Sequence, residues 1–244
     1  MTVTDLSQRP GPAALVLVAH GSRDPRALRT VRALMDRVRA LRPDLPVRLG
    51  HIELNEPLLP DTLAALGDAE AVLVPLLLSR GYHVKQDIPA TAAAATARTR
   101  VAAPLGPHPL LAGTLHDRLL EAGWRPRPAS AVVLAAAGSR DPDAAADTSH
   151  TARLLAGRLG VPVLPAYASA AAPTVQEAIT ALRARGRRHI AVASYFTAPG
   201  RFATECAANA PWIASAPLGA HDAMADLVLH RYERALGTPV TAAA

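Results

Sequence analysis

Short apolar runs alternate along the chain with longer segments in which apolar residues recur every three or four positions. The short runs predict buried strands, and the periodic segments predict helices that cover them. Asp24 followed by Pro25 indicates where the first helix starts, because the carboxylate can accept hydrogen bonds from free backbone N–H groups and proline fits the first turn. The segment 24–41 shows the helical pattern most clearly, with one apolar face made of Leu28, Val31, Leu34, Met35, Val38 and Leu41.

In the first half of the chain this pattern predicts strands at 15–19, 47–53, 71–78 and 100–104, and helices at 24–41, 57–66, 86–97 and 109–122. In the second half it predicts strands at 131–136, 161–168, 189–196 and 213–217. Strands that alternate with helices are typical of α/β proteins, in which parallel sheets are covered on both faces. We therefore expect an α/β fold.

The sequence also repeats itself once. AHGSRDP at 19–25 returns as AAGSRDP at 136–142, and APLGPH at 103–108 returns as APLGAH at 216–221. A weaker similarity links LVPLLLSRGYHVKQDI at 73–88 with AVASYFTAPGRFATEC at 191–206. The motifs keep their order, so we expect two tandem domains of one fold, at 14–122 and 131–236, each with a four-stranded parallel sheet flanked by helices. A linker is expected at 123–130, where two prolines occur, and flexible tails at 1–13 and 237–244.

Composition restricts the class of protein. Half of the 244 residues are hydrophobic, 19% are charged and the mean hydropathy is +0.14, which is typical of a soluble globular chain. The apolar runs stop far short of the roughly 20 residues that a membrane-spanning helix needs. The first residues do not resemble a signal peptide, and Cys206 is the only cysteine, which excludes an internal disulfide or a cysteine-cluster metal site. We expect a cytoplasmic protein with no membrane partner.

The chain carries 26 basic residues against 20 acidic ones, a net charge of +6. All the basic residues except Lys85 are arginine, and such an excess favours an anionic partner. Nucleic acid is not expected, because aromatic residues make up only 3% of the chain and the arginines are scattered along helical segments. The same shortage of aromatic residues predicts that no flat aromatic platform supports the ligand. We expect a small polyanion.

Three ionisable residues of the first half lie at the carboxyl ends of expected strands, where ligands bind in open parallel sheets. His20 and His83 each follow such a strand, and Glu53 ends one. Neighbouring strand ends can direct two imidazoles and one carboxylate at a single point. These groups suit Fe²⁺, Co²⁺, Ni²⁺ or Zn²⁺, and each can also accept a proton near neutral pH.

The second half has lost this trio. Superposing the repeats, with the third pair fixed only to within one residue, aligns His20 with Ala137, Glu53 with Ser169, and His83 with Arg201. The surrounding motif GSRDP is present in both halves. We therefore expect the first half to carry the chemistry and the second to supply shape, charge and the opposite wall.

Other polar residues near the trio have mainly structural interpretations. Glu56 precedes Pro57 and is expected to cap the next helix, unless a one-residue slip of the strand exchanges it with Glu53. Asp87 is expected to start the helix after His83, with an orienting hydrogen bond to that histidine as the alternative. Structural positions are also expected for His51, His108, His221 and Cys206.

Four motifs of the chain, in this order, resemble the sirohydrochlorin chelatase family, the class II chelatases that insert a divalent metal into a tetrapyrrole on the way to sirohaem or cobalamin. They are VAHGSRDP at 18–25, HIELNEPLLP at 51–60, VPLLLSRGYHVKQDIP at 74–89 and PLGPHPLL at 104–111. The resemblance runs over nearly the whole chain and implies two chelatase-like domains, with the active one N-terminal in many long members. It implies that His20 and His83 bind the metal and assist proton removal, with Glu53 as the accompanying carboxylate.

The chemistry of metal insertion agrees with this resemblance. Two pyrrole protons must leave and the metal must exchange its ligands for ring nitrogens, so the site needs a base and a modest ligand set with open positions. No permanently bound cofactor is expected, because the divalent metal, Fe²⁺ first and Co²⁺ next, is itself a substrate. Sirohydrochlorin is a polycarboxylate, and the residues expected to bind it are Ser22, Arg23, Arg80, Arg140 and Arg201.

Two other functions remain open. A tetrapyrrole or metal carrier would bind the same ligands without turnover. Phosphoryl transfer through His20 would need an arginine directly before the histidine, where the chain has Ala19. The oligomeric state is open as well, but two fused halves can form by themselves the paired cleft that a half-length protein builds by dimerising, so a monomer is plausible.

Overall fold

The computed structural model describes residues 12–237 and contains two four-stranded parallel sheets, as the sequence pattern predicts. Apart from residues 12, 13 and 237, the expected tails at 1–13 and 237–244 lie outside the described residues. The first sheet has the order β2-β1-β3-β4 and the second the order β6-β5-β7-β8. Their strands are β1 (Ala14–Ala19), β2 (Val47–His51), β3 (Glu70–Pro75) and β4 (Arg98–Val101), then β5 (Ser130–Ala136), β6 (Val163–Tyr167), β7 (His189–Ser194) and β8 (Ile213–Ala214).

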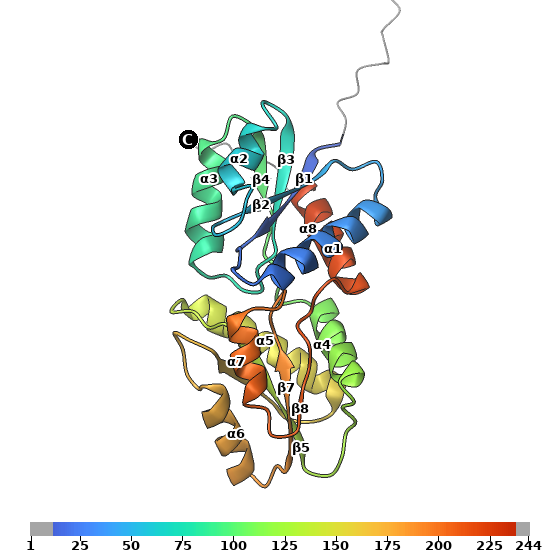
Figure 1. Cartoon of the computed structure of the whole chain (residues 1–244), viewed down its shortest axis with the longest axis vertical. Coiled ribbons are helices and arrows are strands. Elements are labelled where there is room, and N and C mark those ends of the chain that lie inside the picture. Colours follow the sequence, from blue (N-terminus) through green and yellow to red (C-terminus); the bar gives the residue numbers. More distant parts are fainter. Residues whose placement is uncertain (1–11, 238–244) are drawn as a thin grey trace, which may run out of the picture.

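Helices cover both faces of each sheet (Figure 1). They are α1 (Pro25–Leu41), α2 (Leu59–Ala64), α3 (Ile88–Ala94), α4 (Pro109–Glu121), α5 (Pro142–Leu159), α6 (Val175–Ala184), α7 (Arg201–Ala208) and α8 (Asp222–Leu236). A five-residue π-helix, η1 (His83–Asp87), leads directly into α3. Within residues 12–237, no helix is both long and apolar enough to cross a membrane.

The central strand of each sheet is buried on both faces, which is why it reads as an uninterrupted apolar run. Leu15 and Leu17 of β1 face a large core that also includes Val132 and Leu134 of β5. The alternate residues of β1, such as Val16, face a separate core beneath α2 and α3, and a third core lies beneath α6 and α7. One hydrophobic core therefore runs through both halves of the chain.

The last helix of each half packs against the other half. In Figure 1, α8 lies beside α1 on the first sheet, and α4 lies beside α5 on the second. Tyr232 of α8 donates a hydrogen bond to the carbonyl of Ala13 at 2.6 Å, and Arg118 of α4 donates to the carbonyl of Leu218 at 2.9 Å. The segment expected to be a linker is held too, because Trp124 is only 1% exposed in the shared core. The repeat thus assigns α4 to the first half and α8 to the second, whereas each of these helices packs on the sheet of the other half.

Equivalent residues start equivalent helices. Asp24 and Asp141 each accept a hydrogen bond from the backbone N–H two residues on, at 2.9 Å. His108 and His221 do the same through Nδ1, at 3.2 Å. These contacts satisfy N–H groups that a helix leaves free in its first turn, so the structural interpretation of both histidines is confirmed.

Several strands end earlier than the hydrophobic pattern predicts. β2 ends at His51, whose N–H donates to the carbonyl of Pro57 at 3.0 Å, and β3 ends at Pro75. In the same way β4 covers 98–101 rather than 100–104, and the helix expected at 86–97 is preceded by the π-helix. The apolar run of β3 continues past the strand because residues 76–78 line a cavity between the two halves. The apolar character of residues 76–78 therefore reflects their burial and does not show that they belong to the strand.

Burial also gives the protein an expected sensitivity to acid. Desolvation lowers the pKa of His51, His108 and His116 below the ordinary value of 6.5. The unfolded chain therefore takes up protons at these sites before the folded chain does, so stability that is complete above pH 6.5 is lost as the pH falls below it. Urea unfolding should give a smaller free energy at about pH 5.5 than at about pH 7.5. Equal values at the two pH settings would contradict this account.

Candidate active site

The backbone holds His20 and Glu53 next to each other. The chain leaves β1 at His20, and the N–H of Glu53 donates to the carbonyl of His20 at 3.0 Å after β2 has ended. Nδ1 of His20 lies 3.5 Å from Oε1 of Glu53, with the two side chains 44% and 51% exposed. Glu53 therefore follows its strand and does not end it. Glu56 instead accepts a hydrogen bond from the N–H of Leu58 at 3.2 Å, directly before α2, and does not line the cavity.

His83 lies beside these two residues, in the segment that follows β3. It is the first residue of the π-helix, an arrangement frequently found at functional sites. Its ring centroid lies 4.7 Å from that of His20, with the two planes at 87°. Its Nδ1 lies 2.5 Å from Oδ2 of Asp87, so the orienting interpretation of Asp87 is the one that the structure shows. A carboxylate on one ring nitrogen leaves the other nitrogen for a metal ion.

His20, Glu53 and His83 thus lie close together, but their side chains are not yet oriented to bind one metal ion. In the described part of the chain, no group of three His, Cys, Asp or Glu side chains is already arranged to hold a metal ion. The side chains of His20 and Glu53 are about half exposed, and that of His83 is 34% exposed. Exposed side chains change rotamer at small cost, so the trio can turn toward a shared ion without a change in the backbone.

The second half keeps the backbone of this site and lacks its side chains. The N–H of Ser169 donates to the carbonyl of Ala137 at 3.0 Å, the same contact that joins Glu53 to His20. The sequence alignment is therefore confirmed at both of these positions. Neither Ala137 nor Ser169 offers an imidazole or a carboxylate.

The third pair of the alignment is wrong by one residue. Gly81 and Gly200 are equivalent, since each accepts a hydrogen bond from the N–H four residues on, at 3.2 and 3.0 Å. This register places Phe202 opposite His83, whereas the sequence alignment places Arg201 there. Matching the two glycines would have shown this without a structure.

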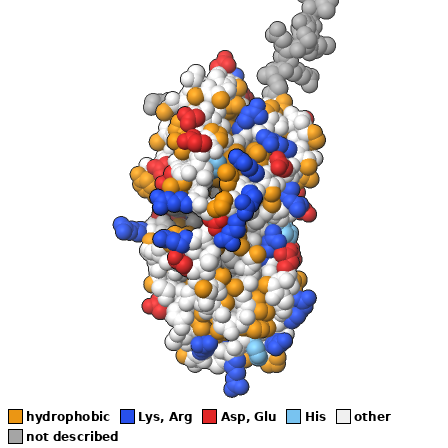
Figure 2. All heavy atoms as spheres, in the orientation of Figure 1, with side chains coloured by type: hydrophobic (Ala, Val, Ile, Leu, Met, Phe, Trp, Pro, Cys, Tyr) orange, Lys and Arg blue, Asp and Glu red, His pale blue; other side chains and the backbone are white. Residues whose placement is uncertain are grey.

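The trio lies on the wall of a large cavity between the halves. Its volume is about 1480 Å³, and it is lined by 19–24, 53–55, 76–79 and 81–84 from the first half and by 136–139 and 195–205 from the second, among other residues. Pockets for drug-sized ligands have roughly 300–1,000 Å³, so this cavity suits a larger molecule. Figure 2 shows Lys and Arg side chains gathered across the middle of the molecule, at the level where the two sheets meet.

Aromatic side chains are concentrated at this cavity, although they make up only 3% of the chain. The chain has eight aromatic residues (two Phe, two Trp and four Tyr), and the five that line the cavity are Tyr82, Tyr167, Tyr195, Phe196 and Phe202. Tyr195 is 2% exposed and donates to the carbonyl of Leu78 at 3.0 Å, whereas Tyr82 is 66% exposed. Total aromatic content did not reveal this, because the residues are far apart in sequence. The position of Tyr82 beside His83 was the one local signal.

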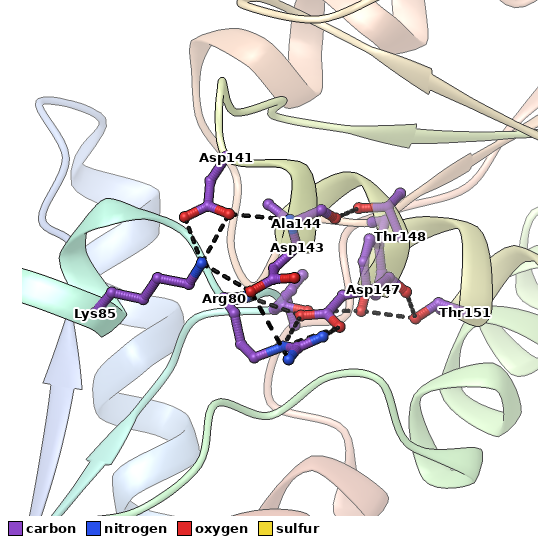
Figure 3. Close-up of polar contacts among 10 residues, drawn as sticks. Arg80, Lys85, Asp141, Asp143, Ala144, Asp147, Thr148 and Thr151 are labelled. Atoms are coloured by element: carbon purple, nitrogen blue, oxygen red, sulfur yellow. Dashed lines mark hydrogen bonds and ion pairs between the residues drawn. The ribbon is translucent and has the colours of Figure 1, made fainter.

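The residues expected to bind substrate fall into two groups. Ser22, Arg23 and Arg201 line the cavity, whereas Arg80 and Arg140 do not. The Arg80 guanidinium, expected to bind substrate, instead donates hydrogen bonds to the buried carboxylate of Asp147 in the second half (Figure 3). Sequence analysis did not identify Asn55, which lines the cavity and accepts a hydrogen bond from the N–H of Ser22 at 2.7 Å.

Several known proteins are similar to this chain. The CbiX family model matches residues 14–122 and again residues 131–235. A sirohydrochlorin ferrochelatase of Bacillus subtilis is 30% identical over 179 residues, which are 69% of this chain and 68% of that protein. A sirohydrochlorin cobaltochelatase of Methanococcus maripaludis is 38% identical over 79 residues, 31% of this chain and 55% of that protein. The chain thus spans about half the length of this archaeal relative.

A solved structure of SirB from Bacillus subtilis with Fe³⁺ has the same fold. Its TM-score is 0.74 at 24% sequence identity, over 92% of this chain and 96% of that chain. A SirB structure in complex with cobalt gives a TM-score of 0.72 at 22% identity. The predicted α/β fold with two four-stranded parallel sheets is confirmed by this likeness and by the topology.

Proposed function

This chain belongs to the CbiX family, and we propose that it is a sirohydrochlorin chelatase, which inserts a divalent metal into the macrocycle with release of two protons. The observation that carries the proposal is the convergence of His20, Glu53 and His83 on the wall of a cavity large enough for a macrocycle. The CbiX match covers both halves, and these three side chains are present only in the first. One working site is therefore proposed.

In this mechanism His20, His83 and Glu53 bind the incoming metal. Asp87 holds the His83 ring so that the nitrogen facing away from it stays available to the ion. As the metal moves from these ligands to the ring nitrogens, the imidazole and carboxylate that it leaves become free bases. They are then positioned to take the two protons that the pyrrole nitrogens release. Three ligands hold the ion firmly enough to bind it and weakly enough to transfer it.

The second half supplies the opposite wall of the cavity. Phe196 and Phe202 offer apolar surface to the macrocycle, and Arg23 and Arg201 offer charge to its carboxylates. Arg201 has a 75% exposed side chain and pairs only loosely with Glu205, at 3.7 Å. Such a guanidinium can exchange this partner for a substrate carboxylate at little cost.

Metal insertion can be tested with purified protein, sirohydrochlorin and either Fe²⁺ or Co²⁺, by following the absorbance of the macrocycle. Acceleration over the spontaneous rate with turnover is expected. Fe²⁺ is proposed as the preferred metal, and the rates with the two metals test this choice. Stoichiometric binding of sirohydrochlorin without turnover would support the carrier function instead. If the protein neither binds sirohydrochlorin nor accelerates metal insertion, both the chelatase and the carrier function are contradicted.

Substitution of Arg201 by glutamine should raise KM for sirohydrochlorin about two- to fivefold and leave kcat nearly unchanged. An exposed charge contact contributes roughly 0.2–1 kcal/mol, and uniform loss of binding appears in KM. Arg153→Gln is the matched control, since Arg153 is exposed on α5 and does not line the cavity. Initial rates over a range of sirohydrochlorin concentrations measure both constants. An unchanged KM in the Arg201 variant would remove this residue from the proposed binding site.

A further inference from the structure

A cluster of charged side chains joins the two halves beside His83. Figure 3 shows two cations of the first half, Arg80 and Lys85, facing three carboxylates on the first turns of α5. The guanidinium of Arg80 lies 2.7 Å from Oδ1 of Asp147, and its backbone N–H donates to Oδ2 of the same residue at 2.9 Å. Nζ of Lys85 lies 2.7 Å from Asp141 and 2.8 Å from Asp143. The two cations stand three residues before His83 and two residues after it.

Asp147 is the centre of this cluster. Its side chain is only 4% exposed, and both of its oxygens are engaged by Arg80. A buried carboxylate that accepts several charge-assisted hydrogen bonds fixes its partner in one geometry. The carboxylates stabilise the charged forms of both cations, since Asp147 raises the pKa of Arg80, and Asp141 and Asp143 raise that of Lys85.

Of this cluster, Asp147, Arg80 and Lys85 have no charged counterpart at the equivalent positions of the other half. The common start of α1 and α5 at Asp24 and Asp141 aligns Asp147 with Thr30. The register set by Gly81 and Gly200 aligns Arg80 with Pro199 and Lys85 with Thr204. The cations therefore occur only on the half with the trio, and the buried carboxylate only on the half without it.

The segment that carries His83 is attached to both halves of the molecule, because η1 continues into α3, whose Ile88 is buried in the first half, and other contacts come from the second half. His20 and Glu53 are fixed to each other by the backbone of the first half. The loop that carries His83 is held from the second half, since Tyr195 donates to the carbonyl of Leu78 at 3.0 Å and the cluster grips Arg80 and Lys85. A displacement of α5 would therefore move His83 relative to the other two side chains.

We propose that Asp147, with Asp141 and Asp143, is a positioning residue: through Arg80 and Lys85 the second half places His83 against His20 and Glu53. The proposal rests on the proposed function only in taking His83 as a metal-binding residue. It gives the second half, which lacks the trio, a part in building the metal site in addition to forming the cavity wall.

Two variants test the proposal, Asp147→Asn and Lys85→Gln, with Glu233→Gln as the control. Glu233 on α8 pairs with Arg42 at 3.4 Å, so the control removes an ion pair remote from the cavity. The first readout needs no metal: the nuclear Overhauser effect between the ring protons of His20 and His83, in protein labelled at histidine. It should be strong in the wild type and in the control, and weak or absent in both test variants.

The second readout is the Kd for Co²⁺ alone, without tetrapyrrole. It should rise about tenfold or more in the test variants, as for other residues that orient a metal ligand, and stay unchanged in the control. Asp147→Glu, which keeps the carboxylate, should recover part of the affinity. Lys85 is the only lysine, so faster modification of its amine in Asp147→Asn would show that the cluster has opened.

Folded test variants that keep both the Overhauser effect and a Kd within about twofold of the wild type would overturn the proposal. If Asp147→Asn does not fold, Lys85→Gln decides, because its 36% exposed side chain is not part of the core. The Overhauser effect also separates this proposal from the proposed function. It reports the placement of His83 even if the wild-type protein inserts no metal into sirohydrochlorin.

Discussion

The His83→Ala protein should fold normally and insert metal at least about 100-fold more slowly than the wild type. His83 is partly exposed and outside the hydrophobic cores, so its loss costs little stability. The variant loses one ligand, and with it one of the bases that become free when the metal moves to the macrocycle. Initial rates with sirohydrochlorin and Fe²⁺, together with circular dichroism, measure the two effects separately.

His150→Ala is the matched control for this experiment. His150 is exposed on α5 and does not line the cavity, so its variant should keep the wild-type rate. His20→Ala should behave like His83→Ala, since both rings face the same point. If either cavity variant kept more than about half of the wild-type rate, the proposed mechanism would be wrong, because a general base or metal ligand contributes much more than twofold.

Alanine at Gly21 should destabilise the protein by at least about 2 kcal/mol, and alanine at Gly138 by a similar amount. The two glycines have φ angles of +102° and +92°, which residues with a side chain rarely adopt. A Cβ at Gly21 would lie 1.8 Å from the carbonyl oxygen of Glu53, and one at Gly138 would lie 1.9 Å from that of Ser169. Either contact would push apart the two loops that it joins.

The consequences for metal binding should differ between these two variants. Gly21→Ala moves Glu53 away from His20, so the affinity for Co²⁺ should fall together with the stability. Gly138→Ala disturbs the equivalent loop of the half without the trio and reaches the site only through α5, so its affinity for Co²⁺ should fall less than that of Gly21→Ala. Urea unfolding and Co²⁺ titration measure the two quantities. Equal losses of affinity in both variants would mean that the site is not confined to the first half.

The sequence was sufficient to predict that His20, Glu53 and His83 lie close together, because the signal is the position of each residue relative to a strand. His20, Glu53 and His83 each stand just beyond an apolar run, and the carboxyl ends of parallel strands meet at one edge of a sheet. The internal repeat then showed that only the first half has these side chains, since Ala137 and Ser169 occupy the positions equivalent to His20 and Glu53. Only the pairing of His83 was wrong by one residue, and matching Gly81 with Gly200 places Phe202 opposite it.

Contacts between distant segments could not be predicted in this way. The exchange of α4 and α8 between the sheets depends on which apolar faces match in three dimensions, and helical periodicity shows only that each helix has such a face. The ion pair of Arg80 is another contact of this kind, so the sequence suggested only that Arg80 binds substrate. The sequence shows a cation near the site, but not that Asp147 lies buried against it.

In the proposed mechanism, His20, His83 and Glu53 of the first half share one metal ion. Anomalous diffraction from crystals of the full chain soaked with Co²⁺ can locate this ion. We expect one cobalt ion with an imidazole nitrogen of each histidine and a carboxylate oxygen of Glu53 at about 2.0–2.2 Å. Cobalt bound elsewhere, with these three side chains free of it, would show that the mechanism is wrong.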